Sequence, residues 1–295
     1  MVNKIKFQAR LVRRALRRSI QRLRFGSLAA SPVLFANSFP KSGTHLLTQV
    51  LQGFSMIGPA VDSGLPAVVT FDGFTGRQRS VDEILADLER LLPGDTGYGH
   101  LHASPPIVEA LCRDGVAAYF ILRDPRDVAV SHVHYIAEMA PNHIHHRYYH
   151  EVLKNFDQRL EASICGVPAE ALTKAAGRTV PEPLPDIRQR FEPYIPWLDQ
   201  PQVLALRFED FIANRGAALL MVLDHAIRRG FQPAVSAEKA IQILEESIDP
   251  QRSPTFRRGR AGGWREAFTP RHLELFQQTA GDLLERLGYE ETGAG

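Results

Sequence analysis

Short apolar runs and stretches of helical periodicity alternate along the chain. The apolar runs cover 33–36, 115–122 and 203–208, and the run 115–122 is continuous, which is typical of a strand buried on both faces of a parallel sheet. Each run is followed by a stretch in which apolar residues recur every three or four positions, the spacing of a helix. Strands that alternate with helices imply βαβ units. The pattern therefore predicts an α/β fold with a central parallel β-sheet flanked by helices.

Capping residues and turn residues locate several further elements. Ser80 and Glu83 have the spacing of a capping box, and Thr269 followed by Pro270 is typical of a helix N-terminus. Helices are expected at 3–25, 80–92, 107–111, 126–135, 209–223, 238–248 and 269–287. The Gly- and Pro-rich segment 55–75 is expected to form a loop with a short strand at 67–71, and the segment 178–201 a loop or a set of short turns.

The expected N-terminal helix is strongly basic. Residues 1–26 carry nine Lys and Arg residues and no acidic residue, so the rest of the chain holds about seven net negative charges within the total of +2. Five apolar residues lie roughly on one side of this helix: Ile5, Val12, Leu16, Ile20 and Leu23. A basic amphipathic helix favours peripheral contact with an anionic membrane. An Arg-rich transit peptide and a solvated tail docked on the domain are the alternatives.

Composition limits the class of protein. A chain of 295 residues, 44% of them apolar, can bury a full core, so we expect one large domain over 27–290 after the basic segment. Cys112 and Cys165 are too few to indicate a disulfide framework or a zinc site, which favours a reducing, cytoplasmic compartment. We expect no transmembrane helix, since no apolar run is long enough, and no signal peptide.

The first apolar run leads into a turn, Phe39-Pro-Lys-Ser-Gly-Thr-His45, and then into a helical stretch. This arrangement binds phosphate, because the first N–H groups of a helix have no internal partner and the helix dipole is positive there. Lys41 adds an ammonium group, and Ser42, Thr44 and His45 can donate hydrogen bonds to anionic oxygens. The loop is not a Walker A sequence, since Lys precedes Ser-Gly-Thr and the leading Gly is missing. An ordinary Mg-nucleotide triphosphate site is therefore disfavoured.

Two further basic motifs occur later in the chain. Arg123 follows the second apolar run, where ligands bind in open α/β sheets, and Ser131 would lie on the second turn of the next helix. The pair could share one anion, and an ion pair of Arg123 with Asp124 or Asp127 is the alternative. The segment 252–264 is a basic, Gly-containing loop, which is either solvated or part of a site.

Histidines gather in the segment 132–150, which holds six of the eleven in the chain. The cluster suggests a metal site, but no pair shows the H-E-x-x-H pattern and the segment contains no Cys. We therefore expect a lid over an acceptor pocket, or a solvated polar face, and no metal. Two more histidines, His100 and His102, lie in a short extended piece before the second long apolar run.

Together the three basic motifs resemble those of one enzyme family. Phe39–His45 resembles the 5′-phosphosulfate loop of PAPS-dependent sulfotransferases, Arg123–Ser131 their 3′-phosphate site, and Phe256–Thr269 their C-terminal Arg-Lys-Gly loop. The motifs occur in family order over about residues 31–289, and their co-occurrence is far more specific than the first alone. The resemblance implies a cytosolic-type sulfotransferase domain with a P-loop NTPase-like fold. Such an enzyme transfers the sulfuryl group of PAPS in line to a hydroxyl or amine and leaves PAP.

The resemblance also implies roles by position. Lys41 would stabilise the leaving phosphate oxygen, and His100 would be the general base, with His102 or a purely structural histidine as the alternatives. Other residues would bind the cofactor: Ser42, Gly43, Thr44 and His45 at the 5′-phosphate; Arg123, Ser131, Arg257, Arg258 and Gly259 at the 3′-phosphate; and Leu46, Phe208, Ser247 and Ile248 near the adenine. No metal would take part.

Several positions depart from the family pattern. Leu46 replaces a Trp that stacks on adenine in many cytosolic members, and Tyr98 stands where those members carry a second active-site Lys. Gly263 replaces the Asp that usually precedes the Trp of the third motif. The family's dimer-contact phrase is matched only in part, by Arg265, Thr269, Pro270 and Glu274. The sequence therefore does not decide whether the protein forms a homodimer.

Two other functions are compatible with the same fold. A small-molecule or nucleotide kinase is disfavoured by the residue order of the phosphate loop, whereas a catalytically silent protein that binds a nucleotide or a sulfated glycan would keep the fold. The acceptor is not specified, because the segments expected to line its pocket, 55–75, 135–160 and 178–200, mix aromatic, Pro and His residues. Small molecules, saccharides and lipids all fit, and no nucleic-acid partner is expected.

Overall fold

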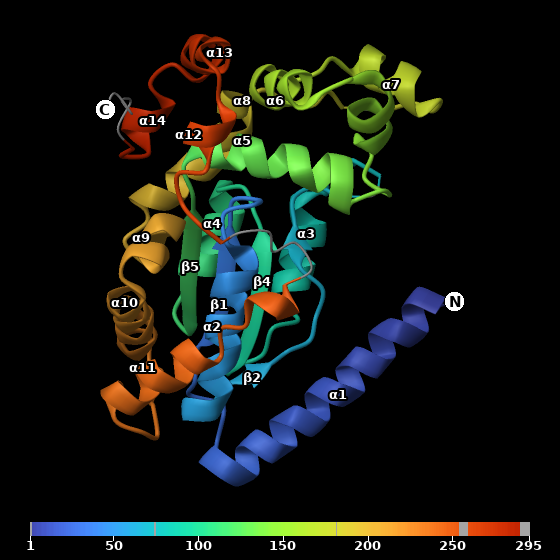
Figure 1. Cartoon of the computed structure of the whole chain (residues 1–295). Coiled ribbons are helices and arrows are strands. Elements are labelled where there is room, and N and C mark those ends of the chain that lie inside the picture. The colour runs from blue at the N-terminus through green and yellow to red at the C-terminus, as the bar shows by residue number, and fades with distance from the viewer. Residues whose placement is uncertain (1, 74, 181, 254–258, 290–295) are drawn as a thin grey trace. The chain divides into compact units, whose positions relative to one another are not determined.

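The computed structural model describes residues 2–73, 75–180, 182–253 and 259–289 (Figure 1). The chain divides into two compact units. The first, which we call the sheet unit, is drawn from Met1–Val69, Ser80–Leu122 and Trp197–Gly259. The second, the helical unit, is drawn from Thr70–Arg79, Arg123–Pro196 and Arg260–Gly295. Each unit is described by itself.

All named strands of the described chain belong to the sheet unit. They are β1 (Val33–Ser38), β2 (Val61–Asp62), β3 (Val68–Val69), β4 (Asp95–His100), β5 (Val116–Leu122) and β6 (Val203–Arg207). The strand order is β2-β4-β1-β5-β6, with β3 also paired to β4, and every ladder is parallel. The central strands β1 and β5 are buried at every residue, which explains why β5 and the first four residues of β1 are apolar. The predicted α/β fold with a central parallel sheet is confirmed.

Helices flank this sheet. They are α1 (Val2–Phe25), α2 (Thr44–Ile57), α3 (Val81–Leu88), α4 (Pro105–Cys112), α9 (Phe208–Ala213), α10 (Arg215–Arg228) and α11 (Ala237–Glu246), with a short 3-10 turn, η4, at Pro250–Arg252. The predicted helix over 209–223 is in fact two helices. Asn214 interrupts it, because its side chain accepts a hydrogen bond of 3.0 Å from Ala217 N and so caps a new helix, α10.

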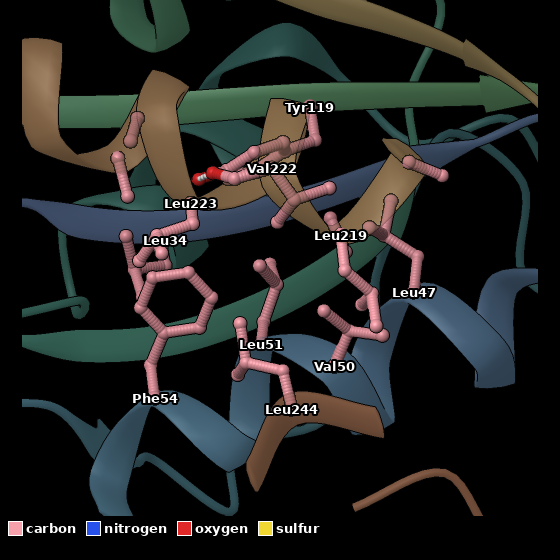
Figure 2. Packing of buried hydrophobic residues seen from close by; sticks show 14 of the residues in the cluster. Leu34, Leu47, Val50, Leu51, Phe54, Tyr119, Leu219, Val222, Leu223 and Leu244 are labelled. Carbon is pink, nitrogen blue, oxygen red and sulfur yellow. Dashed lines mark hydrogen bonds between the residues drawn. The ribbon is translucent and has the colours of Figure 1, made fainter. Parts of the chain in front are cut away.

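The core of the sheet unit lies between the sheet and three helices, α2, α10 and α11. Figure 2 shows the side chains that meet there: Leu47, Val50, Leu51 and Phe54 of α2, Leu219, Val222 and Leu223 of α10, and Leu244 of α11, beside Leu34 and Tyr119 of the sheet. The Tyr119 hydroxyl donates a 3.1 Å hydrogen bond to Val222 O, so its burial leaves no unsatisfied polar group. Because α2 is anchored by a full row of core side chains, the loop that precedes it is held in place.

The helical unit contains α5 (Pro125–His134), α6 (Phe156–Cys165), α7 (Ala169–Ala176), α8 (Ile187–Phe191), α12 (Trp264–Ala267), α13 (Pro270–Ala280) and α14 (Leu283–Arg286). Two π-helical turns, η1 (Tyr135–Met139) and η2 (Tyr148–Val152), lie in the histidine-rich segment. A 3-10 helix, η3 (Glu192–Asp199), runs from this unit into the sheet unit. Helix α5 contacts α6 and α12, and α13 contacts α6 and α8.

Two expectations about helices were wrong in part. The last helix is not continuous, because it ends at Gly281, which has φ 55°, and α14 follows after it. The segment 178–201 is not only loop, since it contains α8 and η3. Asp186 and Gln189 form a capping box at the start of α8, a signal that the prolines of this segment had obscured.

Among the described helices, none has the length and apolar character needed to cross a bilayer.

Candidate functional site

The turn between β1 and α2 is tight and carries backbone strain. Phe39 N donates to Ile121 O at 3.1 Å, and Ser42 N donates back to Phe39 O at 3.2 Å. Pro40 and Lys41 occupy the centre of this turn, and Lys41 has φ 71°. A proline followed by a residue of positive φ is the pattern of a type II turn, in which glycine is usual at the second position. Lys41 is the one non-glycine residue with positive φ in the described chain, which marks it as a candidate for function.

Gly43 lets a bulky side chain pack against this turn. It has φ 101°, and a Cβ atom there would lie 2.8 Å from Phe208 Cδ2 and 3.2 Å from Ile121 Cδ1. No larger residue fits without movement of the Phe208 ring, which is buried at the start of α9. Phe208, a predicted cofactor residue, therefore lies directly against the predicted phosphate loop.

The start of α2 offers hydrogen-bond donors. Gly43 is its N-cap and provides no side-chain acceptor for the first amides of the helix. Ser42 is fully buried, and within the described residues its hydroxyl has no hydrogen-bond partner. A buried hydroxyl without a partner is unfavourable, so a ligand oxygen at this point would relieve it. The loop is thus chemically suited to an anion.

His100, at the end of β4, is hydrogen-bonded to the residue that precedes this turn. Its Nδ1 lies 3.0 Å from Ser38 O and 3.1 Å from Ser38 Oγ. A carbonyl oxygen can only accept, so Nδ1 carries the proton and Nε2 keeps its lone pair. Ser38 Oγ also lies 2.8 Å from Thr44 Oγ1. A short chain of hydrogen bonds therefore links the imidazole of His100 to the first residue of α2.

The electrostatic surroundings keep these histidines neutral. Burial lowers the pKa of His100 below its usual 6.5, the hydrogen bond to Ser38 opposes this shift, and the charges of His45 and Lys41 lower the pKa further. The pKa of His45 is lowered by burial and by Lys41, and that of His102 by burial to about 4. His100 and His102 are thus both neutral near pH 7. Only His100 is connected to the loop by the hydrogen bonds described above.

Asn37 fixes the backbone of Leu101, the residue that follows His100. Its Nδ2 donates to Leu101 O at 3.0 Å, and Leu101 N donates to its Oδ1 at 2.8 Å. Trp197 Nε1 donates to the same carbonyl at 2.7 Å. Sequence reasoning missed both Asn37 and Ser38. The available signal was two polar residues at the end of an otherwise apolar strand, and both prove to be buried.

Arg123, in the helical unit, is engaged with an acid. Its guanidinium donates to Asp127 Oδ2 at 3.1 Å and to Arg260 O at 2.9 Å. Asp127 in turn accepts hydrogen bonds of 2.8 Å from the amides of Gly262 and Trp264. The ion pair with Asp127, one of the two alternatives, is therefore present. It joins α5 to the loop before α12.

The third motif is only partly within the described residues. Arg257 and Arg258 lie outside them, and Gly259 has φ 60°. Ser131 is half-buried on α5, as expected from its spacing. Trp264, which anchors the end of the motif, packs under the guanidinium of Arg126, 3.9 Å from the ring centroid.

The residues expected near the adenine have packing roles of their own. Ser247 Oγ donates to Leu244 O at 2.6 Å and lies 3.2 Å from Gln49 O, so it joins α11 to α2. Ile248 and Leu46 are partly buried against the core of the sheet unit. A role at the adenine stays a prediction for these residues.

The histidine-rich segment forms local hydrogen bonds. His132 Nδ1 lies 3.0 Å from Ser163 Oγ, and His146 Nδ1 lies 2.7 Å from Ile136 O. Burial lowers the pKa of His143 to about 4 and that of His145 to about 3. Across the described ranges, no three His, Cys, Asp or Glu side chains are grouped in a way that could hold a metal.

Comparison with known proteins shows a shared fold. No protein-family model and no curated protein matches this chain. Among solved structures, retinol dehydratase in complex with androsterone and the inactive cofactor PAP matches with a TM-score of 0.54 at 16% identity, covering 88% of this chain and 83% of that one. Retinol dehydratase with retinol and PAP matches with a TM-score of 0.54 at 17% identity, covering 86% and 82%.

A third match is mouse sulfotransferase SULT7A1 complexed with PAP, with a TM-score of 0.53 at 19% identity, covering 90% of this chain and 88% of that one. At these identities the likeness establishes the fold alone. All three of these structures contain PAP.

Proposed function

We propose that this chain is a sulfotransferase that takes the sulfuryl group of PAPS and transfers it to an acceptor hydroxyl or amine. One observation carries the proposal. A neutral imidazole, His100, is hydrogen-bonded to Ser38 and through it to Thr44, where α2 begins behind an anion-type loop. Transfer from an anionic donor needs a base beside such a loop. The fold shared with structures that hold PAP supports PAPS as the donor.

The loop residues fit the anionic end of such a donor. Ser42 offers a buried hydroxyl that lacks a partner in the described chain, and the first amides of α2 have no side-chain cap. In this proposal the 5′-phosphate is bound by Ser42, Gly43, Thr44 and His45. PAPS supplies the sulfuryl group, and Lys41 stabilises the charge that develops on the leaving oxygen.

His100 takes the proton of the acceptor at Nε2. The bond from Nδ1 to Ser38 O sets the tautomer, and the bonds from Asn37 to Leu101 hold the backbone next to the ring. Because burial lowers the pKa of His100, the ring is neutral and able to accept a proton near pH 7. General-base catalysis of this kind contributes about 10²–10⁴ in rate.

The second phosphate of the donor is assigned to Arg123 and Ser131. Strands β1 and β5 are neighbours in the sheet, and Ser38 is the register partner of Ile121. The anion loop follows Ser38 in the chain, and Arg123 directly follows the last residue of β5. In an open α/β sheet a nucleotide usually binds at the carboxyl ends of parallel strands, which is where the anion loop begins after β1. Arg257, Arg258 and Gly259 are proposed to complete the 3′-phosphate site, and Leu46, Phe208, Ser247 and Ile248 to lie near the adenine.

Calorimetric titration of the full chain with PAP tests the proposal. We expect micromolar binding that weakens at least about tenfold in Lys41→Ala and in Arg123→Ala, because each removes a charge-assisted contact to phosphate. Arg271→Ala serves as the matched control, since Arg271 is exposed and its ion-pair partner among the described residues is Glu274. Absence of PAP binding by the parent chain would overturn the proposal.

Turnover then separates an enzyme from a silent binder. Radiolabelled PAPS is offered with phenol, saccharide, lipid and amine acceptors, and transfer is expected with at least one class. PAP binding without transfer to any of them would favour a silent nucleotide-binding protein. Mg²⁺-dependent turnover of ATP by the same preparation would favour a kinase.

A further inference from the structure

Helix α1 is attached to the sheet unit by its arginines. Arg14 and Arg18 are both buried and both pair with Asp95, which is fully buried, with 2.7 Å between Arg18 Nη1 and Asp95 Oδ1. Arg17 pairs with Asp62 at 2.9 Å next to them. The polar side of the helix is therefore turned toward the protein, alongside β2 (Figure 1).

The apolar side of α1 is turned toward solvent. Its five large apolar residues are 53–90% exposed: Ile5, Val12, Leu16, Ile20 and Leu23. Their spacing of three, four or seven positions places them on one face of the helix. An ordinary surface helix has the opposite arrangement, with its apolar stripe on the core. An exposed apolar stripe of this length, on a helix whose other face already contacts the protein, indicates a surface that binds another apolar partner.

One border of this stripe is cationic. Lys6, Arg13 and Arg24 are exposed, and α1 contains no acidic residue. Arg10, Arg13 and Arg17 line a cavity of about 290 Å³ between α1, α2 and the edge of the sheet. Within the described residues, neither Arg10 nor Arg13 has an ion-pair partner. The stripe is thus bordered by positive charge that the protein itself does not neutralise.

We propose that the outward face of α1 docks on an anionic phospholipid membrane. The five apolar side chains enter the boundary between head groups and acyl chains, and the arginines beside them meet lipid phosphates. The buried pairs with Asp95 keep the helix attached to the protein while its other face is bound. The membrane then holds the sheet unit through α1, independently of any sulfuryl transfer.

A second copy of this chain fits the stripe less well. Two α1 helices packed antiparallel through their apolar faces would bring the cationic borders (Lys6, Arg13 and Arg24) of the two copies together, with no acid on either helix to separate them. Like charges at such a border oppose association. An anionic lipid surface supplies the missing negative charge.

The test is co-sedimentation of the full chain with vesicles of phosphatidylcholine alone and of phosphatidylcholine mixed with phosphatidylserine. We expect the parent to pellet with the mixed vesicles, and Leu16→Glu with Leu23→Glu to lower its partitioning at least about tenfold. Leu220→Glu with Met221→Glu is the matched control. It makes the same charge change at two exposed apolar residues of α10 and should pellet like the parent. Thermal unfolding followed by circular dichroism checks that each variant is folded.

A second variant tests the cationic border. Lys6→Gln with Arg13→Gln should lower partitioning onto the mixed vesicles about tenfold or more and weaken its dependence on salt, since each basic residue contributes about 1 kcal/mol at such a surface. Failure of the parent to pellet with the mixed vesicles, or equal pelleting by the Leu16→Glu, Leu23→Glu variant, would overturn the proposal. So would a lipid-free dimer, seen by analytical ultracentrifugation, that this variant dissociates, because the stripe would then be an interface between copies.

Discussion

Two basic sites, the loop around Lys41 and the segment around Arg123, differ in how their polar groups are satisfied. In the loop, Ser42 carries a buried hydroxyl with no partner in the described chain, and the helix behind it has no side-chain cap. At Arg123 the guanidinium already pairs with Asp127, which also accepts two backbone amides. The loop therefore has an unsatisfied donor that fits the proposed phosphate, whereas the Arg123 segment is stabilised by internal hydrogen bonds. A phosphate there must share the arginine with Asp127.

We expect the largest difference between the two sites when His100, the proposed base beside the loop, is substituted. His100→Ala is expected to lower turnover by about 10²–10⁴ while PAP binding is kept, because the proton acceptor is lost and the phosphate contacts are not. Steady-state kinetics and PAP calorimetry measure the two quantities. His102→Ala is the matched control. If it causes the larger loss of turnover, the roles of the two histidines are reversed.

The second effect concerns the Arg123 segment. Asp127→Asn should lower the free energy of unfolding by about 3 kcal/mol, because it leaves the largely buried guanidinium of Arg123 without its carboxylate and weakens the hydrogen bonds from two backbone amides. Chemical denaturation measures this change. Asp282→Asn removes an exposed carboxylate that pairs with Arg188 at 2.9 Å, and about 1 kcal/mol or less is expected. Equal effects of the two variants would show that Asp127 does not organise its segment.

Gly43→Ala should produce the third effect, in the loop. The new Cβ would lie 2.8 Å from the Phe208 ring, and φ 101° is unfavourable for alanine, so we expect a cost of about 1–3 kcal/mol and at least about tenfold weaker PAP binding. Gly73→Ala is the control, since a Cβ there would lie within 4 Å of no atom of the described residues beyond its chain neighbours. PAP binding that survives Gly43→Ala unchanged would mean that the loop does not hold the ligand.

The smallest effect is on pH dependence. Burial lowers the pKa of His143 to about 4 and of His145 to about 3, so the unfolded chain binds more protons than the folded chain between these values and 6.5. The stability that these two neutral histidines contribute is therefore fully present above pH 6.5 and decreases as the pH falls toward 4. His145→Gln should flatten this slope in denaturation series. Turnover, which needs neutral His100, should likewise fall only below pH 6.5.

Much of the fold could be predicted from sequence because its central strands are buried on both faces. Apolar runs located β1, β5 and β6, and the short strand expected at 67–71 contains β3, whereas β2 has two residues and leaves no pattern. The break at Gly281 was missed because the apolar positions keep their helical spacing across it. Local patterns therefore predict long elements well and short ones poorly.

The candidate site could be predicted only where it follows a local motif. Lys41 and its neighbours are contiguous, so their type and order indicate an anion loop. The contribution of Ser38 depends on the pairing of β1 with β4, which brings His100 next to it from 62 residues away. In the same way, the amphipathic pattern of α1 predicts a helix but not its orientation. Asp95, far away in sequence, decides which face is buried.

At Lys41, the residue that would give the most stable backbone differs from the residue that the proposed chemistry requires. For folding alone, glycine would be the better residue at φ 71°, by about 1 kcal/mol. Lys41→Gly should therefore yield a slightly more robust protein that has lost its ammonium group. An inactive variant that melts later than its parent would make the trade-off visible at a single position.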